Sequence, residues 1–148
     1  MIKKFISKLF DIHPDAMSFK QGMDLTGIPV CTFSQGDKKL NFILDTGSTD
    51  NIIDSNVLKQ IEHQMVEGAS NTLTGMDGIT HKVEVCNITV SYKDREYPFT
   101  YLVKDMKAPF AMFKRDYGVN IHGMIGSNFF NKFRYVLDFG KLIAYSKE

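Results

Sequence analysis

Short apolar runs separated by turn-forming residues recur along the chain and predict strands. The runs "GIPVCTF" (27–33) and "LNFIL" (40–44) flank the polar segment "SQGDKK", which predicts two strands joined by a turn. "NIID" (51–54) predicts another short strand beyond a cluster of small polar residues. We therefore expect this part of the chain to be β structure.

Helical spacing follows in residues 54–65. The apolar positions that recur at this spacing are Val57, Leu58, Ile61 and Met65. Asp54 or Ser55 precedes them and has the side-chain oxygen that an N-cap requires. This segment therefore predicts a helix.

Residues 71–103 return to a β pattern on both sides of Gly75, Met76, Asp77 and Gly78, which predicts a hairpin tip. In the second arm, one face would carry Val83, Val85, Asn87 and Thr89. The other face would carry Lys82, Glu84, Cys86, Ile88 and Val90, so neither face is cleanly apolar. The turn "KDRE" leads into a further strand at "YPFTYLV" (97–103).

The last third of the chain mixes short elements. Residues 104–122 have room for one short helix, and "GMIG" (123–126) is a small apolar stretch between two glycines. Ser127 is expected to be the N-cap of about two helical turns. Residues 134–146 predict a closing hairpin around Phe139 and Gly140. The whole pattern predicts a mostly-β domain with a few short helices.

The first 25 residues do not share this pattern. The apolar positions Ile2, Phe5, Ile6, Leu9 and Phe10 recur at helical spacing and indicate a short amphipathic helix. Lys8 interrupts the apolar run, which does not fit a secretory signal, and no segment approaches the length of a membrane span. After Pro14 the chain is irregular to about Leu25. We expect an N-terminal extension (1–25), a domain (26–148), no membrane partner and a cytoplasmic location.

Composition narrows the function classes. A chain of 148 residues is long enough for one domain with its own core, and a formal net charge of +1 gives no reason to expect nucleic acid as a partner. Cys31 and Cys86 lie inside apolar runs and are expected to be reduced core residues. The histidines, at positions 13, 63, 81 and 122, show no metal-ligand spacing. We therefore expect neither a metal nor a cofactor.

Candidate chemistry begins at Asp45, where the apolar run ends and "TGS" follows. An ordinary turn between two strands would also contain Asp and Gly. Each residue nevertheless has a chemical use. Thr46 can bond a neighbouring loop, Gly47 can adopt an unusual conformation that brings its N–H to the carboxylate, and Ser48 can donate to the outer carboxylate oxygen. A carboxylate held in this way stays ionisable beside apolar strands.

The segment "FILDTGST" (42–49) resembles the catalytic loop of single-domain, bacterial-type retropepsin-like aspartic proteases. The order of further features is similar: the hairpin tip at residues 75–78 resembles the flap, "GMIGSNFF" resembles the second motif, and residues 134–146 resemble the final hairpin. The resemblance covers roughly residues 27–146. It implies a mostly-β retropepsin-like barrel with a few short helices, active as a symmetric homodimer.

The resemblance implies an aspartic endopeptidase in which two carboxylates about 3 Å apart share a proton and activate water. This chain has one such loop. Asp138 lacks the hydroxyl residue that should follow it and is expected to be an exposed or capped acid at a strand end. Asp50 and Asp54 are too close in sequence to face Asp45. We therefore expect Asp45 of two subunits to meet on the axis of a homodimer.

The same resemblance implies an extended polypeptide substrate. Gly126 and the flap residues Gly75, Met76, Asp77 and Gly78 would bind the peptide backbone or cover it. Ile52 and Ile53 would shape apolar subsites, and Asp50 lies close enough to meet a polar or basic substrate side chain.

Two alternatives stay open at this point. One is a catalytically silent dimerisation or peptide-binding module that keeps the loop geometry. The other is a domain cut from a longer polyprotein or modular protein. The dimer edge also stays open between the N-terminal segment and the hairpin of residues 134–146.

Overall fold

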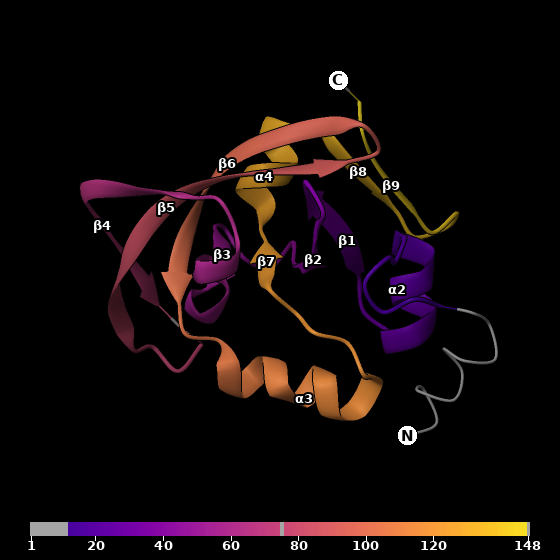
Figure 1. The fold of residues 1–148 in the computed structure, drawn as a ribbon, viewed down its shortest axis with the longest axis horizontal. Coiled ribbons are helices and arrows are strands. Elements are labelled where there is room, and N and C mark those ends of the chain that lie inside the picture. Colours follow the sequence, from indigo (N-terminus) through magenta and orange to yellow (C-terminus); the bar gives the residue numbers. More distant parts are fainter. Residues whose placement is uncertain (1–11, 75, 148) are drawn as a thin grey trace.

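The structure is a computed structural model that describes residues 12–74 and 76–147 (Figure 1). The strands are β1 (Val30–Gln35), β2 (Lys38–Leu44), β3 (Asn51–Asp54), β4 (Gln64–Thr74), β5 (Thr80–Tyr92), β6 (Arg95–Lys104), β7 (Gly123–Ile125), β8 (Tyr135–Asp138) and β9 (Ile143–Ser146). The helices are α2 (Phe19–Thr26), the 3₁₀ helix η1 (Ser55–Gln60), α3 (Lys107–Tyr117) and α4 (Ser127–Lys132). The expected mostly-β class with a few short helices is confirmed.

Six strands close into a barrel. They follow the order β1-β2-β7-β3-β6-β5, and β5 returns to β1 through the pair Ser34 and Ser91. Strand β4 pairs only with β5 and extends from the barrel as one arm of a long hairpin, while β8 and β9 form a separate two-stranded sheet. Strand β7 lies between β2, to which it is parallel, and β3, to which it is antiparallel.

The core is aromatic. Phe129 of α4 is fully buried and lies edge-on to Phe33 of β1 and tilted against Tyr97 of β6, with ring centroids 6.4 Å and 5.4 Å away. Each such ring stabilises the fold by about 1.5–3 kcal/mol relative to an exposed position. Helix α4 is therefore fixed to the barrel by its buried face, which matters because α4 begins at the candidate site.

Neither face of β5 is cleanly apolar in sequence, and the structure explains why. Val83 and Val85 pack with Leu102 of β6 in a small cluster of their own. Cys86, Ile88 and Val90 turn into the main core from the opposite face of the strand. The strand therefore buries one face near the hairpin and the other face in the barrel, which is why neither face is apolar throughout.

The helix expected over residues 54–65 is only partly confirmed. Asp54 is the N-cap and accepts a hydrogen bond from Asn56 N, but η1 ends at Gln60 and Met65 belongs to β4. The side chain of Gln35 explains the early end, because it donates to the Glu62 carbonyl and accepts from the Glu62 N–H at 2.8 and 2.7 Å. These bonds hold the chain against β1.

The N-cap of α4 is also one residue earlier than expected. Gly126, rather than Ser127, occupies that position, and it has no side chain with which to cap the helix. The first N–H groups of α4 find other acceptors, which belong to the candidate site.

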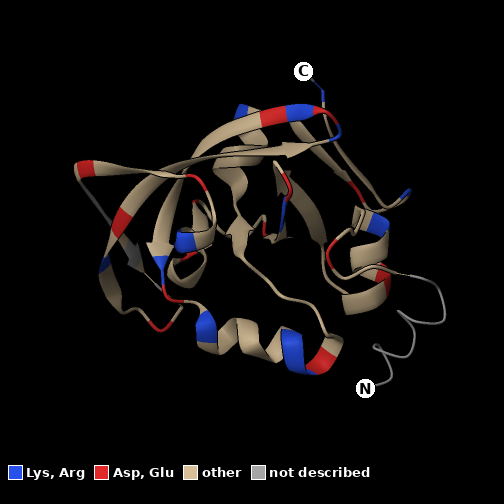
Figure 2. Ribbon diagram, in the orientation of Figure 1, with Lys and Arg blue, Asp and Glu red and all other residues tan. Residues whose placement is uncertain are grey.

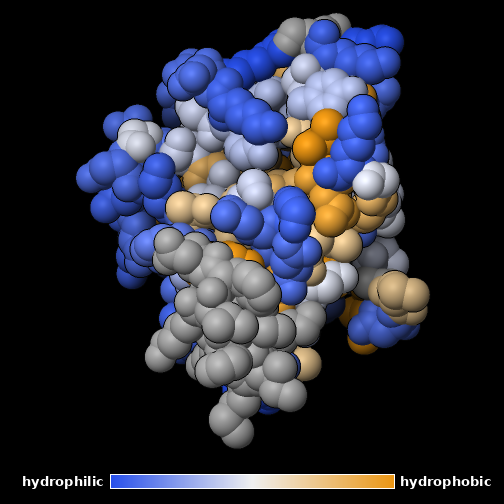
Figure 3. All heavy atoms as spheres, turned by 90° about the vertical axis from the view of Figure 1, so that its right-hand side faces the viewer, coloured by the Kyte–Doolittle hydropathy of each residue, from blue (hydrophilic) through white to orange (hydrophobic). Residues whose placement is uncertain are grey.

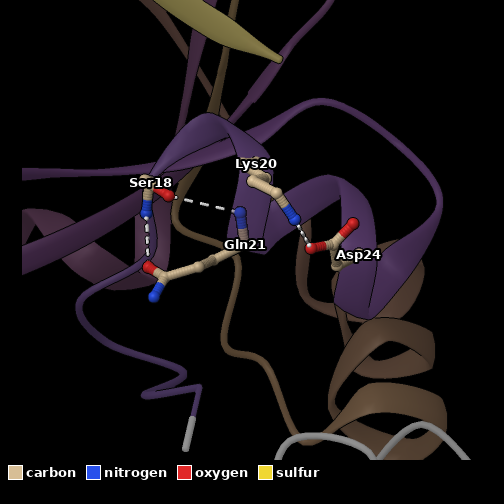
Figure 4. Close-up of polar contacts among 4 residues, drawn as sticks. All are labelled: Ser18, Lys20, Gln21 and Asp24. Carbon is tan, nitrogen blue, oxygen red and sulfur yellow. Dashed lines mark hydrogen bonds and ion pairs between the residues drawn. The ribbon is translucent and has the colours of Figure 1, made fainter. Parts of the chain in front are cut away.

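The expectation that residues 14–25 are irregular is wrong, because α2 forms there (Figure 4). Ser18 Oγ accepts from Gln21 N at 3.2 Å, and Gln21 Oε1 accepts from Ser18 N at 3.0 Å, which completes a capping box. Gly27 ends the helix with a φ of 77°. Phe19 and Leu25 are buried, so α2 packs on the barrel. The helix predicted for residues 2–10 lies outside the described residues.

Charge and apolar surface are distributed differently. Basic and acidic residues are interspersed over the strands and helices (Figure 2), in keeping with the small net charge. The side of the molecule with α2 and the β8–β9 hairpin carries a strip of hydrophobic residues (Figure 3). Phe139, Ile143 and Tyr145 of the hairpin region are exposed.

Asn41 of β2 joins the N-terminal segment to the barrel. Its side chain is wholly buried, donates to the carbonyls of Pro14 and Asn120 at 2.7 and 2.9 Å, and accepts from Thr32 Oγ1 at 2.6 Å. Its backbone N–H donates to His122 Nδ1 at 2.9 Å. This last bond requires a neutral imidazole, because a protonated Nδ1 has no lone pair to accept it.

We expect Ser18→Ala to lower the free energy of unfolding by about 1 kcal/mol, because the capping box loses an acceptor. Urea unfolding measures the change. Lys20→Ala is the matched control on the same helix: it removes an exposed ion pair with Asp24 and should cost at most about 0.5 kcal/mol. If Ser18→Ala leaves global unfolding unchanged, α2 does not belong to the cooperative unit of the barrel.

A second prediction concerns His122. Burial lowers its pKa, against the raising effect of the Asp15 and Asp54 carboxylates. A base with a lowered pKa binds fewer protons folded than unfolded, so its contribution to stability is present above pH 6.5 and lost as the pH falls below that value. The urea midpoint of the wild type should therefore fall between pH 7.5 and pH 5 by more than that of His122→Asn. Equal falls would contradict this role of His122.

Candidate active site

The candidate site is the loop between β2 and β3, which begins at Asp45. Phe42 and Leu44 bury their side chains and carry β2 through the barrel, and Asp45 follows where the strand ends. The Asp45 N–H donates to the Ile125 carbonyl of β7 at 2.8 Å. The Asp45 side chain is partly exposed. The barrel therefore delivers a carboxylate to its surface on a fixed backbone.

The loop orients the Asp45 carboxylate. The Gly47 N–H donates to Asp45 Oδ1 at 2.9 Å, as expected from the sequence. The expected unusual conformation of Gly47 is not found, since its φ lies outside the left-handed region. A Cβ at Gly47 would lie 3.2 Å from Asp45 Oδ1, a tight contact with the end of a side chain.

Ser48 holds the loop rather than the carboxylate. Its hydroxyl donates to the Asp50 carbonyl at 2.9 Å, so the expected bond to the outer oxygen of Asp45 is wrong for this structure. Its N–H donates to the Asp45 carbonyl at 3.2 Å. Thr46 lies exposed at the loop tip. Its expected bond to a neighbouring loop, which in a homodimer would be that of the second subunit, stays a prediction.

The junction of β7 and α4 closes the loop from the other side. The Ser127 and Asn128 N–H groups donate to the carbonyls of Ser48 and Thr49 at 2.8 and 3.0 Å. The first-turn donors of α4, which lack partners within the helix, are thus satisfied by the loop. The Asp45 loop and α4 therefore form one hydrogen-bonded unit.

Gly126 is the closest point of this contact. Its N–H donates to Asn51 Oδ1 at 2.8 Å. A Cβ at this position would lie 2.5 Å from the Asp50 carbonyl oxygen and 2.7 Å from that of Ser48. Only glycine fits such an approach. The role of Gly126 in binding substrate stays a prediction, and Asn51 is a member of the site that sequence reasoning missed.

Three other acids near the loop or hairpin have structural partners. Asp54 Oδ1 accepts from the N–H groups of Asn56 and Met106 at 3.2 and 3.1 Å. Asp50 Oδ1 accepts from Asn128 Nδ2 at 3.2 Å. Asp138 Oδ1 accepts from Lys141 N at 2.9 Å, which confirms the expected capped acid at a strand end.

The hairpin of β4 and β5 ends where the flap was expected. Its tip is turned by Gly78, with a φ of 80°, and by Asp77, whose Oδ1 accepts from Ile79 N at 2.9 Å. Met76 is fully exposed. Gly75 lies outside the described residues. The hairpin and the Asp45 loop are separate elements here, and their meeting over a substrate stays a prediction.

Ile52 follows the loop in β3. Its side chain is 6% exposed, next to Met124 of β7 in the strand register. Ile53 is wholly buried in the main core. Ile53 therefore supports the barrel, and the contribution of Ile52 to a subsite stays a prediction.

In residues 12–74 and 76–147, no group of three or more metal-ligating side chains occurs. None of the helices there is long and apolar enough to cross a membrane. Cys31 and Cys86 are free and buried, and burial raises their thiol pKa values to about 12 and about 11. Such thiols are poor nucleophiles.

The fold has relatives among solved structures. EIAV protease, in a complex with the inhibitor HBY-793, has a TM-score of 0.50 and 19% identity over 73% of this chain and 89% of that protein. The retroviral protease-like domain of Ddi1 from Leishmania major has a TM-score of 0.51 and 12% identity over 82% of this chain and 89% of that domain. The sequence matches no family model and no curated protein. These likenesses show the fold, which is retropepsin-like.

We expect Gly126→Ala to destabilise the fold by about 1–3 kcal/mol, because the new Cβ must displace two backbone carbonyls. Urea unfolding measures the loss. Gly140→Ala is the matched control, since its Cβ would meet only the end of the Asp138 side chain, at 3.2 Å, and should change stability by at most about 0.5 kcal/mol. Equal losses in the two variants would contradict the close approach at Gly126.

Proposed function

We propose that this chain is an aspartic endopeptidase that hydrolyses peptide bonds as a homodimer. The observation that supports it best is the Asp45 carboxylate, which lies at the end of a buried strand, partly exposed, with a backbone N–H fixed on one oxygen. The close approach at Gly126 and the hydrogen bonds from the first turn of α4 hold the loop that carries this carboxylate. The retropepsin-like fold is the second support.

The proposed reaction needs two such carboxylates facing each other. At about 3 Å they cannot both ionise, so the pair holds one proton and titrates as a unit. The ionised member takes a proton from water, and the protonated member donates to the scissile carbonyl oxygen as the water attacks. The resulting diol collapses when the leaving nitrogen is protonated. Neither a metal nor a cofactor enters these steps.

The second carboxylate would come from another copy of the chain. Asp50, Asp54 and Asp138 each accept hydrogen bonds that hold local structure, and we infer that none of these three is the partner of Asp45. A two-fold axis through the loop brings Asp45 and Thr46 of both subunits together. The apolar residues exposed on the β8–β9 hairpin favour that edge as part of the interface.

The proposed substrate is an extended polypeptide in a cleft across the axis. Gly126 and the hairpin tip of residues 75–78 would bind its backbone, with Met76 and Asp77 above it and Ile52 beside an apolar side chain. Closing the hairpin over the peptide would exclude water from the dyad. We propose a cytoplasmic location for this activity.

Cleavage of an unstructured peptide library at pH 4 to 7 tests the proposal. We expect Asp45→Asn to lower the cleavage rate about 10²–10⁴-fold, the usual contribution of a general acid or base. Asp94→Asn is the control, because Asp94 lies in the β5–β6 turn at a φ of 62° that Asn tolerates. It should keep wild-type activity. Equal rates in Asp45→Asn and the wild type would overturn the catalytic role.

Mixing the two proteins tests the dimer. If each active site needs Asp45 from both subunits, mixed dimers are inactive. After exchange with an equal amount of Asp45→Asn, a fixed amount of wild type should therefore show about half the activity that the same amount shows alone. Unchanged activity would mean that one chain is sufficient. Binding of peptides without cleavage by the wild type would favour a silent peptide-binding module.

A further inference from the structure

Behind the Asp45 loop lies a buried amide side chain whose oxygen accepts a hydrogen bond, while its nitrogen has no well-formed one. Asn51, the first residue of β3, is 1% exposed. Its Oδ1 accepts from Gly126 N at 2.8 Å. Its Nδ2, together with the Tyr101 hydroxyl, is buried without a well-formed hydrogen bond among the described residues. A natural protein that keeps such a group usually has a use for it.

The orientation of this amide is fixed by chemistry. A backbone N–H can only donate, so the Asn51 atom facing Gly126 must be the oxygen. Nδ2 then points away from Gly126. Asn51 and Tyr101 are register partners on β3 and β6, and burial raises the pKa of the Tyr101 hydroxyl while Asn51 acts to lower it. The Tyr101 oxygen is thus the polar neighbour that favours this orientation.

The Asn51 side chain supplies a hydrogen bond at a position where β3 and β7 no longer pair. Strands β3 and β7 pair at Ile52 with Met124 and at Ile53 with Gly123. Beyond Ile125 the chain turns into α4, so Gly126 has no strand partner on this side. The Asn51 side chain reaches across and binds it. On the other side of the same segment, Asp45 N binds the Ile125 carbonyl.

Several bonds that hold the loop join backbone to backbone and are indifferent to side-chain identity. This is true of the bonds from Asp45, Ser127 and Asn128. The bond from Gly126 is different, because it is buried and it depends on the side chain at position 51. A change at this position can therefore shift the loop without altering the residues that meet substrate.

We propose that Asn51 is a positioning residue for the reaction, holding Gly126 N–H so that the Asp45 loop stays in its productive place. The inference rests on the proposed function. Asn51 is 1% exposed, so we place it behind the loop rather than against the substrate. It acts through Gly126, whose carbonyl neighbours belong to the loop that carries Asp45.

The stability cost of replacing Asn51 should be partly offset. Asn51→Leu leaves the buried Gly126 N–H unpaired and takes the amide away from the Tyr101 hydroxyl, but it also removes the cost of burying a polar side chain whose nitrogen lacks a well-formed hydrogen bond. These effects oppose each other. Activity and stability should therefore separate, which an ordinary core residue would not show.

The experiment compares Asn51→Leu with Asn87→Leu, the same chemical change at an exposed position of β5. In Asn51→Leu we expect kcat to fall about 10–100-fold with KM within about twofold, because a loop shifted by a fraction of an ångström misplaces the dyad. Asn51→Asp keeps an acceptor oxygen at this position and should restore most of kcat at pH 5, where burial keeps its carboxyl protonated. Asn87→Leu should match the wild type.

Amide hydrogen exchange at Gly126 gives a readout that does not need activity. The Gly126 N–H should be protected in the wild type and exchange at least about tenfold faster in Asn51→Leu, with Val90 of the core unchanged. Protection lost in Asn51→Leu with an inactive wild type would sink the protease proposal and leave the positioning contact standing. An unprotected Gly126 in the wild type would overturn the inference even if Asn51→Leu does not fold. Unchanged kcat in a folded Asn51→Leu would also overturn it.

Discussion

The close backbone contact between the Asp45 loop and the junction of β7 and α4 is the constraint on which the site depends. Strand β7 is only three residues long, yet it pairs with β2 on one side and β3 on the other. Both ends of the loop are therefore fixed to the same short segment. Glycines make this possible: a Cβ at Gly123 would lie 2.5 Å from the Ile52 carbonyl oxygen, as close as a Cβ at Gly126 would lie to that of Asp50. Larger residues would separate the strands.

This constraint explains why the loop has one fixed side and one exposed side. The loop is bonded on its inner side by β7 and α4, and its outer side carries Asp45 and Thr46 towards solvent. A carboxylate prepared in this way can accept one further strong partner without rearrangement. In the proposed homodimer, a second copy of the same rigid loop would be that partner, and rigidity on both sides would limit how far the two acids can separate.

Much of the fold could be predicted because short apolar runs between turns determine β1, β2 and β3. The prediction failed where partners distant in sequence decide the structure: Gln35 ends the helix near Glu62, and pairing with β5 turns residues 64–70 into a strand. Helix α2 is different, since Ser18, Gln21 and Gly27 are local signals that were readable. In the site, the Gly47 bond was predicted from adjacent residues. The role of Asn51 was not, because its partner Gly126 is 75 positions away.

The N-terminal segment is linked to the same strand that delivers the candidate acid. Asn41 lies four positions before Asp45, and its buried side chain binds the Pro14 carbonyl, Thr32 of β1 and the Asn120 carbonyl ahead of β7. A buried amide that loses one of these partners retains the cost of an unpaired polar group. Displacement of Pro14 would therefore be felt in β2 and in the approach to β7. The two strands that fix the Asp45 loop thus share a polar anchor with Pro14, ahead of the barrel.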